Sequence, residues 1–206
     1  MRGLYLITND DEFSLLQQKL QLALDAAPIA LLQYRRKQVT GVDQLAEIEQ
    51  LIRLCQLYQV PLIINDQLEH ARQFGCGLHL GQRDGSLPEA RKILGDKVII
   101  GRTCHASLEL AKQAAEEGAS YLAFGTVYPS ASKPEAKEVS LAVLQQARQY
   151  FDVPVCAIGG LTVENSKPLV EAGLDLFAVI GDVLNLPLPQ VAQRAQQWVN
   201  LLKMSV

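Results

Sequence analysis

The stretch PLIINDQLEHARQFGCGLHLGQRD, residues 61–84, holds one complete unit of a pattern that repeats along the chain. Its two apolar runs, PLIIN and GLHL, flank a segment with room for one short helix over Leu68–Phe74. Nearly continuous apolar residues, without alternation, are typical of strands buried on both faces of a parallel sheet. Each run ends in polar residues, Asn65 and Asp66 after the first and Gln82 and Asp84 after the second.

The same pattern extends over the whole chain. Six further apolar runs are LYLIT from Leu4, IALLQYR from Ile29, VIIGR from Val98, YLAFG from Tyr121, VPVCAIGG from Val153 and DLFAVIG from Asp175. Helical spacing of apolar residues occurs between runs, in FSLLQQKLQLALDA, LAEIEQLIRLCQLY, SLELAKQAAEEG and VSLAVLQQARQYF. The eight units predict one domain, residues 1–206, folded as a small (β/α)8 TIM barrel. An open doubly wound sheet is the alternative, and the regular spacing of the units favours closure.

Composition narrows the class of partner. The chain has 206 residues, of which 49% are hydrophobic and 20% are charged, and a formal net charge of −3. This balance offers no broad cationic surface, so we expect neither nucleic acid nor an anionic membrane as a partner. No apolar run approaches the ~20 residues that a membrane helix needs.

The cysteines and the N-terminal residues predict a cytoplasmic protein. MRGLYLITND has polar residues too early for the apolar segment of a signal peptide. The four cysteines lie far apart in apolar contexts and lack metal-ligand spacing, which favours buried free thiols in a reducing compartment. Cys104 has no identifiable basic partner, so we expect an inert thiol.

Polar side chains follow most of the predicted strands, and in a barrel these strand ends converge on one mouth. Arg35, Lys37 and Lys133 are placed to surround an anion, and the hydroxyls of Ser130 and Ser132 add donors. The glycine pair 159–160 lets the backbone approach a ligand closely. The turn at Gly181 precedes a predicted helix, whose first N–H groups suit a phosphate.

Asp66 and Asp84 follow neighbouring strands, so we expect their carboxylates to meet. Two carboxylates beside phosphate-binding cations are typical of a Mg²⁺ site that bridges a diphosphate. Capping of the turn after it would explain Asp84 alone but not the neighbouring Asn65 and Asp66. We expect His79, inside its strand, to be packed and hydrogen-bonded. His105, at the mouth, either touches substrate or orders its loop.

The residues at the strand ends also carry a family resemblance. QYRRK, NDQ, HLGQRD, GRTCH, PSASK, AIGG and VIG occur in this order, and together they resemble thiamine phosphate synthase over nearly the whole chain. The resemblance implies a small (β/α)8 barrel. It also implies a transferase of thiamine biosynthesis, which joins an aminopyrimidine methyl diphosphate to a thiazole phosphate and releases diphosphate. In the implied mechanism, a carbocation forms at the pyrimidine methylene, the thiazole nitrogen attacks it, and no protein nucleophile takes part.

The resemblance assigns a task to each cluster. It implies Mg²⁺ as the cofactor, held by Asp66 and Asp84. Arg35, Lys37 and Lys133 would stabilise the charge that grows on the leaving diphosphate. The implied substrate-binding residues are Gln33, Tyr34, Arg35, Arg36, Lys37, Asn65, Thr103, His105, Ser130, Ser132, Lys133, Gly160, Ile180 and Gly181.

Several positions depart from the family pattern. Thr103 stands where the family usually has Ser, and Ser130 and Ser132 stand where it usually has Thr, so a hydroxyl is kept at all three. Gly181 replaces a usual Ser, and Asp182 follows where a small residue is common. We expect Asp182 to compete mildly with the thiazole phosphate for helix N–H groups, or else to point to solvent. PEAKEVS, after Lys133, also lacks the adjacent Lys and the Val-Gly pair that are common there.

Two rival functions stay open at this point. A thiazole tautomerase would use His105 as a proton carrier and would need no Mg²⁺, which leaves the two carboxylates without a task. A non-catalytic thiazole phosphate-binding paralogue would fit the departures at Gly181 and Asp182. In every case the expected partners are small phosphorylated molecules, and a homodimer is left open.

Overall fold

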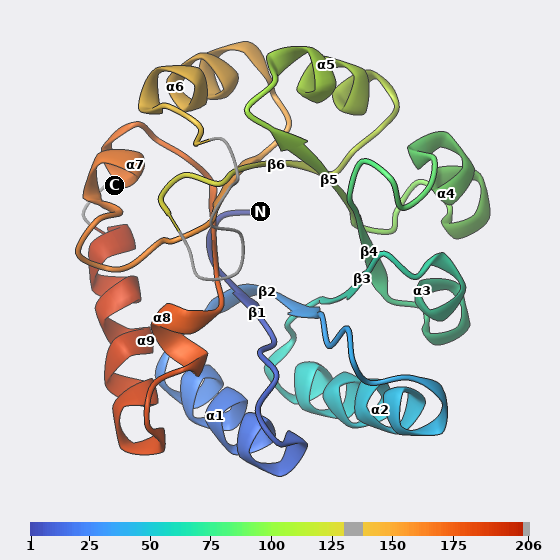
Figure 1. Cartoon of the computed structure of the whole chain (residues 1–206), viewed down its shortest axis with the longest axis vertical. Coiled ribbons are helices and arrows are strands. Elements are labelled where there is room, and N and C mark those ends of the chain that lie inside the picture. Colours follow the sequence, from blue (N-terminus) through green and yellow to red (C-terminus); the bar gives the residue numbers. More distant parts are fainter. Residues whose placement is uncertain (130–137, 204–206) are drawn as a thin grey trace.

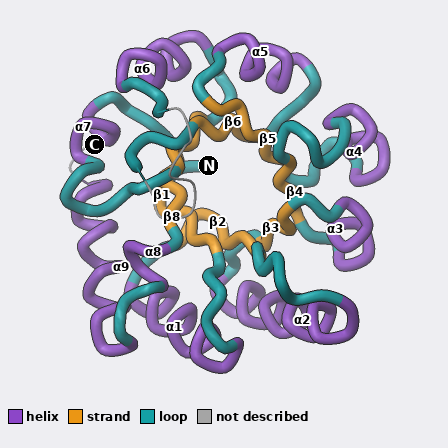
Figure 2. The backbone as a smooth tube through the Cα atoms, in the orientation of Figure 1, coloured by secondary structure: helices purple, strands orange, loops and turns teal. Residues whose placement is uncertain are grey.

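A computed structural model shows a closed barrel of eight parallel strands surrounded by helices, as the sequence predicts (Figures 1 and 2). The structure describes residues 1–129 and 138–203. Neighbouring strands pair in chain order, and β1 closes the ring against β8. The strands are β1 (Gly3–Ile7), β2 (Ile29–Tyr34), β3 (Leu62–Asn65), β4 (Gly77–Leu80), β5 (Ile100–His105), β6 (Tyr121–Phe124), β7 (Val155–Ile158) and β8 (Leu176–Val179).

Helices form the outer layer. They are α1 (Phe13–Ala26), α2 (Gly41–Tyr58), α3 (Leu68–Phe74), α4 (Leu87–Leu94), α5 (Leu108–Glu116), α6 (Leu141–Tyr150), α7 (Lys167–Glu171), α8 (Gly181–Leu184) and α9 (Leu188–Lys203). The predicted bounds of α1 and α3 are confirmed. Among the described residues, no helix combines the length and the apolarity that crossing a membrane requires.

Strand β5 is the element whose predicted position was wrong. The apolar run predicts a strand over 98–102, whereas β5 covers Ile100–His105. Pairing with β4 sets this register, because Gly101 lies opposite His79 and Arg102 opposite Leu80. The shift places Thr103 and His105 inside the strand rather than in the loop that follows it.

Strand residues alternate between the barrel interior and the layer beneath the helices, with the two-residue period of a strand. The interior cluster consists of Tyr5, Ile7, Leu31, Ile63, Tyr121, Ala123, Cys156, Leu176 and Ala178. The residues between them pack outward in a second, larger cluster. All four cysteines are buried free thiols, as expected, and burial raises the pKa of Cys104 to about 12.

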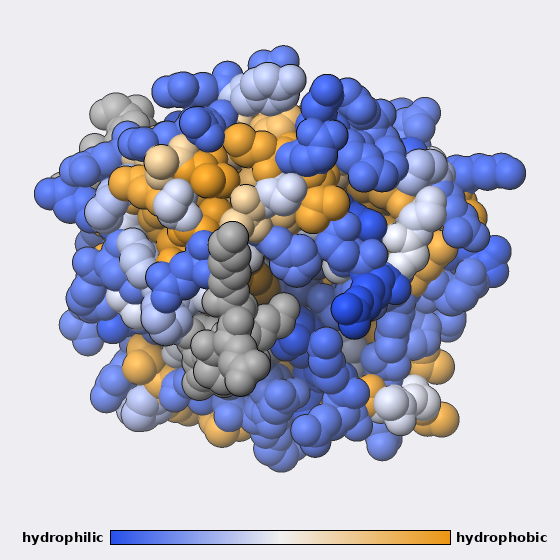
Figure 3. Space-filling model, turned by 45° about the horizontal axis from the view of Figure 1, so that its top comes forward, coloured by the Kyte–Doolittle hydropathy of each residue, from blue (hydrophilic) through white to orange (hydrophobic). Residues whose placement is uncertain are grey.

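The outer surface is mainly hydrophilic in the view of Figure 3, with a group of hydrophobic residues across its upper part. Among the described residues, the large hydrophobic side chains that are most exposed are Val42, Leu57 and Tyr150. Val42 and Leu57 both belong to α2, and Tyr150 ends α6. These three therefore lie on the helical layer, away from the barrel interior.

Gly101 makes room for an aromatic ring inside the barrel. A Cβ added at this position would overlap the ring and the hydroxyl of Tyr121 on the neighbouring strand. Gly101 does not have a positive φ, so its requirement is space rather than backbone conformation.

We predict that Gly101→Ala lowers the free energy of unfolding by about 1–3 kcal/mol through overpacking. The measurement is urea denaturation of four proteins: wild type, Gly101→Ala, Tyr121→Leu and the double variant. Because leucine vacates the space that the added methyl needs, Gly101→Ala should cost clearly less in the Tyr121→Leu background. Equal costs in both backgrounds would show that the ring is not the obstacle.

Candidate active site

In the QYRRK segment at the end of β2, alternate side chains face opposite sides of the strand. Gln33 points into the barrel, where its Nε2 donates to Tyr5 Oη at 2.6 Å. Tyr34 and Arg36 point to the helical layer. Tyr34 Oη donates to Glu47 Oε2 of α2 at 2.7 Å, and Arg36 Nε lies 2.9 Å from the same oxygen. The structure thus assigns these two side chains to the packing of α2 on the barrel, a role that the sequence prediction of substrate binding did not anticipate.

A pocket of about 220 Å³ opens at the ends of β2 and β3. It brings together the predicted residues Arg35, Lys37, Asn65 and Asp66. The remaining lining residues are Tyr34, Arg36, Gln44 and Gln67. Gln44 and Gln67 join at 2.9 Å from Nε2 to Oε1, so they form one continuous wall. Sequence reasoning missed both glutamines, because nothing in the sequence places the start of α2 beside the end of β3.

The carboxylates of Asp66 and Asp84 face each other, as their neighbouring strand ends predict. Burial raises the pKa of Asp66, and the nearby Asp84 raises it further, whereas Lys37 lowers it. Asn65 Nδ2 donates to Asp66 Oδ2 at 2.5 Å and orients that carboxylate. Asp66 has a left-handed backbone, with φ 63°, and its N–H donates to His79 O at 2.8 Å.

Gly81 keeps the space between the two acids open. A Cβ there would overlap the Asp84 carboxylate and would lie 4.0 Å from Asp66 Oδ1. The helix that follows, α4, begins with Ser86 as its cap, whose hydroxyl accepts from Glu89 N at 3.3 Å. The capping of α4 therefore rests on Ser86. The glycine in HLGQRD could have indicated that position 81 has no room for a side chain, but the sequence prediction did not use it.

The donor set of Asp66 and Asp84 fits Mg²⁺ with a phosphorylated ligand. Within residues 1–129 and 138–203, no group of three or more His, Cys, Asp or Glu side chains gathers as a metal site. Mg²⁺ is commonly bound through one or two carboxylates, together with water and substrate phosphates. A half-buried acid and an exposed acid beside Arg35 and Lys37 suit that mode better than a site built from protein ligands alone.

The histidines differ in role. His79 is buried and hydrogen-bonded to Tyr121 and Thr103, as predicted. Thr103 is half-buried at the mouth, and its carbonyl accepts a hydrogen bond from Gln82 Nε2. His105 is exposed at the end of β5 and has a left-handed φ of 51°.

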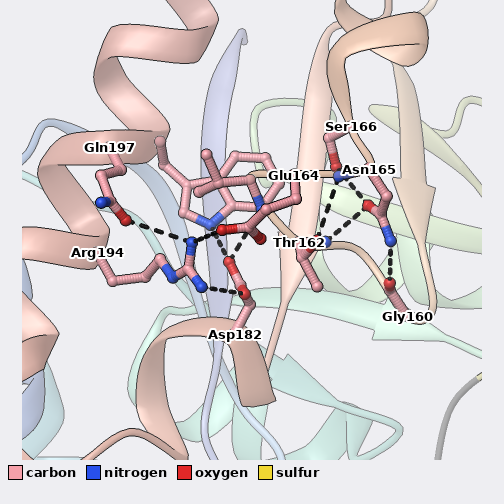
Figure 4. A network of polar contacts seen from close by, with 10 residues as sticks. Gly160, Thr162, Glu164, Asn165, Ser166, Asp182, Arg194 and Gln197 are labelled. Carbon is pink, nitrogen blue, oxygen red and sulfur yellow. Dashed lines mark hydrogen bonds and ion pairs between the residues drawn. The ribbon is translucent and has the colours of Figure 1, made fainter.

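The glycine pair after β7 serves the packing of two loops. A Cβ at Gly160 would lie 2.6 Å from the carbonyl oxygens of Tyr128 and of Pro129, and one at Gly159 would lie 2.8 Å from the Cα of Thr126. Both glycines have positive φ. The close approach is thus made by the segment after β6, and Asn165 Nδ2 holds the Gly160 carbonyl at 2.9 Å (Figure 4).

The structure contradicts both predictions made for Asp182, which were competition for helix N–H groups and exposure to solvent. Its side chain is only 5% exposed, so it does not point to solvent. Its Oδ2 accepts from Trp198 Nε1 at 2.7 Å and from Val163 N at 3.3 Å, and its Oδ1 lies 3.5 Å from Arg194 Nη2 (Figure 4). The carboxylate therefore joins α8 to α9 and to the loop after β7 instead of competing for a phosphate. Burial raises its pKa, and Trp198 and Arg194 oppose that shift.

Gly181 begins α8, directly after Ile180 at the end of β8. A Cβ at Gly181 would lie 3.0 Å from Asn185 Nδ2, and Asn9 Nδ2 donates to the Oδ1 of the same asparagine at 3.0 Å. The space of the missing side chain is thus partly taken by Asn185. Three predicted site residues, Ser130, Ser132 and Lys133, lie outside the described residues.

We predict that Asp182→Ala lowers the free energy of unfolding by about 1–3 kcal/mol, because it leaves buried N–H donors without an acceptor. Asp182→Asn keeps an acceptor oxygen and should recover most of this loss. Glu164→Ala is the matched control, since Glu164 pairs with the same Arg194 at 2.6 Å but is 66% exposed. Its cost should stay below about 0.5 kcal/mol, as for other exposed ion pairs. Equal costs for Asp182→Ala and Glu164→Ala in urea denaturation would contradict the buried role.

A second prediction concerns the acidic pair in metal-free protein. The pKa of Asp66 is raised in the folded state, so folded protein takes up a proton that unfolded protein does not hold. Stability should therefore increase as pH falls toward the ordinary pKa of an aspartate. Asp84→Asn removes the repulsion and should stabilise the protein at pH 7 by at most about 1 kcal/mol, because exposed charges are screened.

The measurement is urea denaturation in EDTA at neutral and at mildly acidic pH, and Asp152→Asn, at an exposed position, is the control. The gain from Asp84→Asn should shrink as pH falls, because Asp66 then becomes neutral in wild type as well. A gain that does not depend on pH, or a loss of stability, would contradict the proximity of the two charges.

Comparison with known proteins agrees with this architecture. A model of the thiamine monophosphate synthase family matches residues 4–183. A thiamine phosphate pyrophosphorylase from Pyrococcus furiosus is similar with 26% identity and TM-score 0.86, over 99% of this chain and 96% of the other. One from Bacteroides thetaiotaomicron has 18% identity and TM-score 0.68, over 99% of each chain. Mycobacterium tuberculosis tryptophan synthase shares the fold at 10% identity and TM-score 0.70, over 98% of this chain and 93% of the other. Because the family model covers most of the chain, the protein belongs to the thiamine monophosphate synthase family.

Proposed function

We propose that this protein joins an aminopyrimidine methyl diphosphate to a thiazole phosphate, forming thiamine phosphate and releasing diphosphate in a Mg²⁺-dependent reaction. The observation that supports this most is the pairing of Asp66 with Asp84 beside Arg35 and Lys37 at one side of the barrel mouth. Burial and the nearby Asp84 raise the pKa of Asp66, and a cation bound between the two carboxylates would offset this cost. A bound Mg²⁺ would supply positive charge to the diphosphate oxygens.

Side chains of the protein would bind the diphosphate and stabilise its charge. Arg35 and Lys37 would hold the diphosphate and stabilise the negative charge that grows on it as the bond to the methylene breaks. Lys133 would add a third positive charge. Asn65 keeps the Asp66 carboxylate in place through their 2.5 Å hydrogen bond. The pocket beside these groups would accept the leaving diphosphate. Binding there would keep the diphosphate apart from the pyrimidine ring.

The second phosphate would bind at the ends of β7 and β8. Gly160, Ile180 and Gly181 lie there, and Ser130 and Ser132 belong to the segment after β6. The buried position of Asp182 removes the main argument for a non-catalytic paralogue, because this carboxylate is held by Trp198 and Val163. A thiazole tautomerase would leave the acidic pair without a task.

The four buried free thiols support a cytoplasmic location as part of this proposal. The proposed partners are the two phosphorylated small molecules. A homodimer also fits the proposal.

We predict that release of diphosphate from the two substrates requires Mg²⁺ and that Asp66→Asn and Asp84→Asn each lower turnover on the order of 100-fold or more. The loss follows from removal of the charge that holds the cation. A coupled assay of diphosphate with and without EDTA measures the effect, with Asp152→Asn as the control. Circular dichroism spectra of the variants should match wild type.

Three outcomes would contradict the proposal. Turnover that EDTA does not change would remove the role of Mg²⁺. Isomerisation of a thiazole carboxylate phosphate without coupling would indicate a tautomerase. Binding of both substrates without any release of diphosphate would indicate a non-catalytic protein.

A further inference from the structure

Arg36 is a buried cation between two cations that are accessible at the barrel mouth. It is 8% exposed, whereas Arg35 is half-buried and Lys37 is exposed. All three residues line the pocket at the ends of β2 and β3. They share one pocket, but the burial of Arg36 indicates a role different from that of its two neighbours.

The side chain of Arg36 joins three segments of the protein. Its Nη1 donates to the backbone oxygens of Asn9 at 3.0 Å and of Asp11 at 2.6 Å, both in the loop after β1. Its Nε lies 2.9 Å from Glu47 Oε2 of α2, in an ion pair. The guanidinium carbon lies 5.9 Å from the centre of the Phe13 ring, where α1 begins. Groups of the protein itself therefore hold the charge of Arg36.

The backbone on both sides of Arg36 is also held in place. Arg35 N donates to Thr8 Oγ1 at 2.8 Å, and Thr8 is 1% exposed. Val39 N donates to Arg36 O at 3.3 Å and closes the turn that contains Lys37. The loop after β1 thus holds this segment twice, through the N–H of Arg35 and through the side chain of Arg36.

Direct binding of a ligand by Arg36 would disturb these contacts. The guanidinium would have to leave Glu47, which is buried and would lose the cation beside it. A buried carboxylate without a partner is unfavourable. By contrast, the ion pairs within residues 1–129 and 138–203 involve neither Arg35 nor Lys37, so a ligand that binds these two cations breaks none of them.

We propose that Arg36 is a positioning residue. It holds the turn so that Arg35 and Lys37 present their charges to the leaving diphosphate, and it does not bind the diphosphate itself. The inference rests on the proposed function, because it assigns a task within the diphosphate site. Tyr34 Oη donates to the same Glu47 oxygen, so α2 holds both the end of β2 and the turn after it. Such support matters because a small displacement of a positioning group can lower catalysis strongly.

The first test measures the affinity for inorganic diphosphate, with Mg²⁺ present, by calorimetry. The variants are Arg36→Met, which keeps an unbranched apolar stem, and Arg36→Met/Glu47→Met, which leaves the net charge unchanged. Replacing both members of a buried ion pair by apolar residues often preserves stability, which urea denaturation checks. We expect binding to be about tenfold weaker in both variants. Arg53→Met, at an exposed position on α2, is the control and should bind as wild type does.

Double-mutant cycles separate positioning from direct binding. If Arg36 acts through its neighbours, Arg36→Met should weaken diphosphate binding only about threefold when Arg35→Met or Lys37→Met is already present. A direct ligand would instead cost the same in every background, and this result would overturn the inference. Wild-type affinity in a stable Arg36→Met/Glu47→Met protein would also overturn it, because Arg36 would then act only through the stability of the fold.

A further measurement needs no ligand. Hydrogen exchange of ¹⁵N-labelled protein reports on the N–H groups of Arg35 and Val39, which hold the turn. Both should exchange about tenfold faster in Arg36→Met/Glu47→Met, whereas the N–H of Leu144 in α6 should not change. Unchanged exchange at Arg35 and Val39 would overturn the inference. Failure of wild type to bind diphosphate would refute the proposed function, whereas equal losses in every background, in a protein that binds diphosphate, would refute the positioning role alone.

Discussion

The two-residue period of a strand in a closed ring is the constraint on which the rest of this molecule depends. Each strand residue must face either the interior or the layer beneath the helices, and closure leaves no edge where this choice is relaxed. Gln33 and Tyr34 are neighbours in sequence, yet one bonds Tyr5 inside the barrel and the other bonds Glu47 on α2. The same parity places His79, Thr103 and Tyr121 in one shared interior, although they come from three strands.

The acidic pair at the mouth is electrostatically unfavourable in the metal-free folded protein. Asp66 and Asp84 face each other, and burial and mutual repulsion raise the pKa of Asp66. Lys37 lowers the pKa of Asp66, and Asn65 donates a hydrogen bond to its carboxylate, but the net shift of this pKa is still upward. A bound cation would offset this unfavourable electrostatic energy, which supports the proposal that the metal and the diphosphate bind on this side of the barrel.

The other side of the mouth is held by packing and buried hydrogen bonds. Asp182 fastens α8 to Trp198 of α9 and to Val163 after β7, while Gly159 and Gly160 let the segment after β6 lie against that loop. The oxygens of this acid accept hydrogen bonds from Trp198 on α9 and from Val163 in the loop after β7. The departure from the family pattern is therefore a local solution for joining the last helices to the barrel.

The sequence by itself determined the architecture and most of the residues at the mouth. Continuous apolar runs separated by helical spacing predict a parallel barrel, and the polar residues after each run predict where a site forms, because both signals are local. Asp66 and Asp84 were found in this way. The register of β5, the outward direction of Tyr34 and Arg36, and the burial of Asp182 were decided only by the tertiary structure. Each depends on a partner far away in the chain, such as His79 opposite Gly101, Glu47 on α2 or Trp198 on α9, and no local pattern encodes which distant donor or acceptor a side chain will meet.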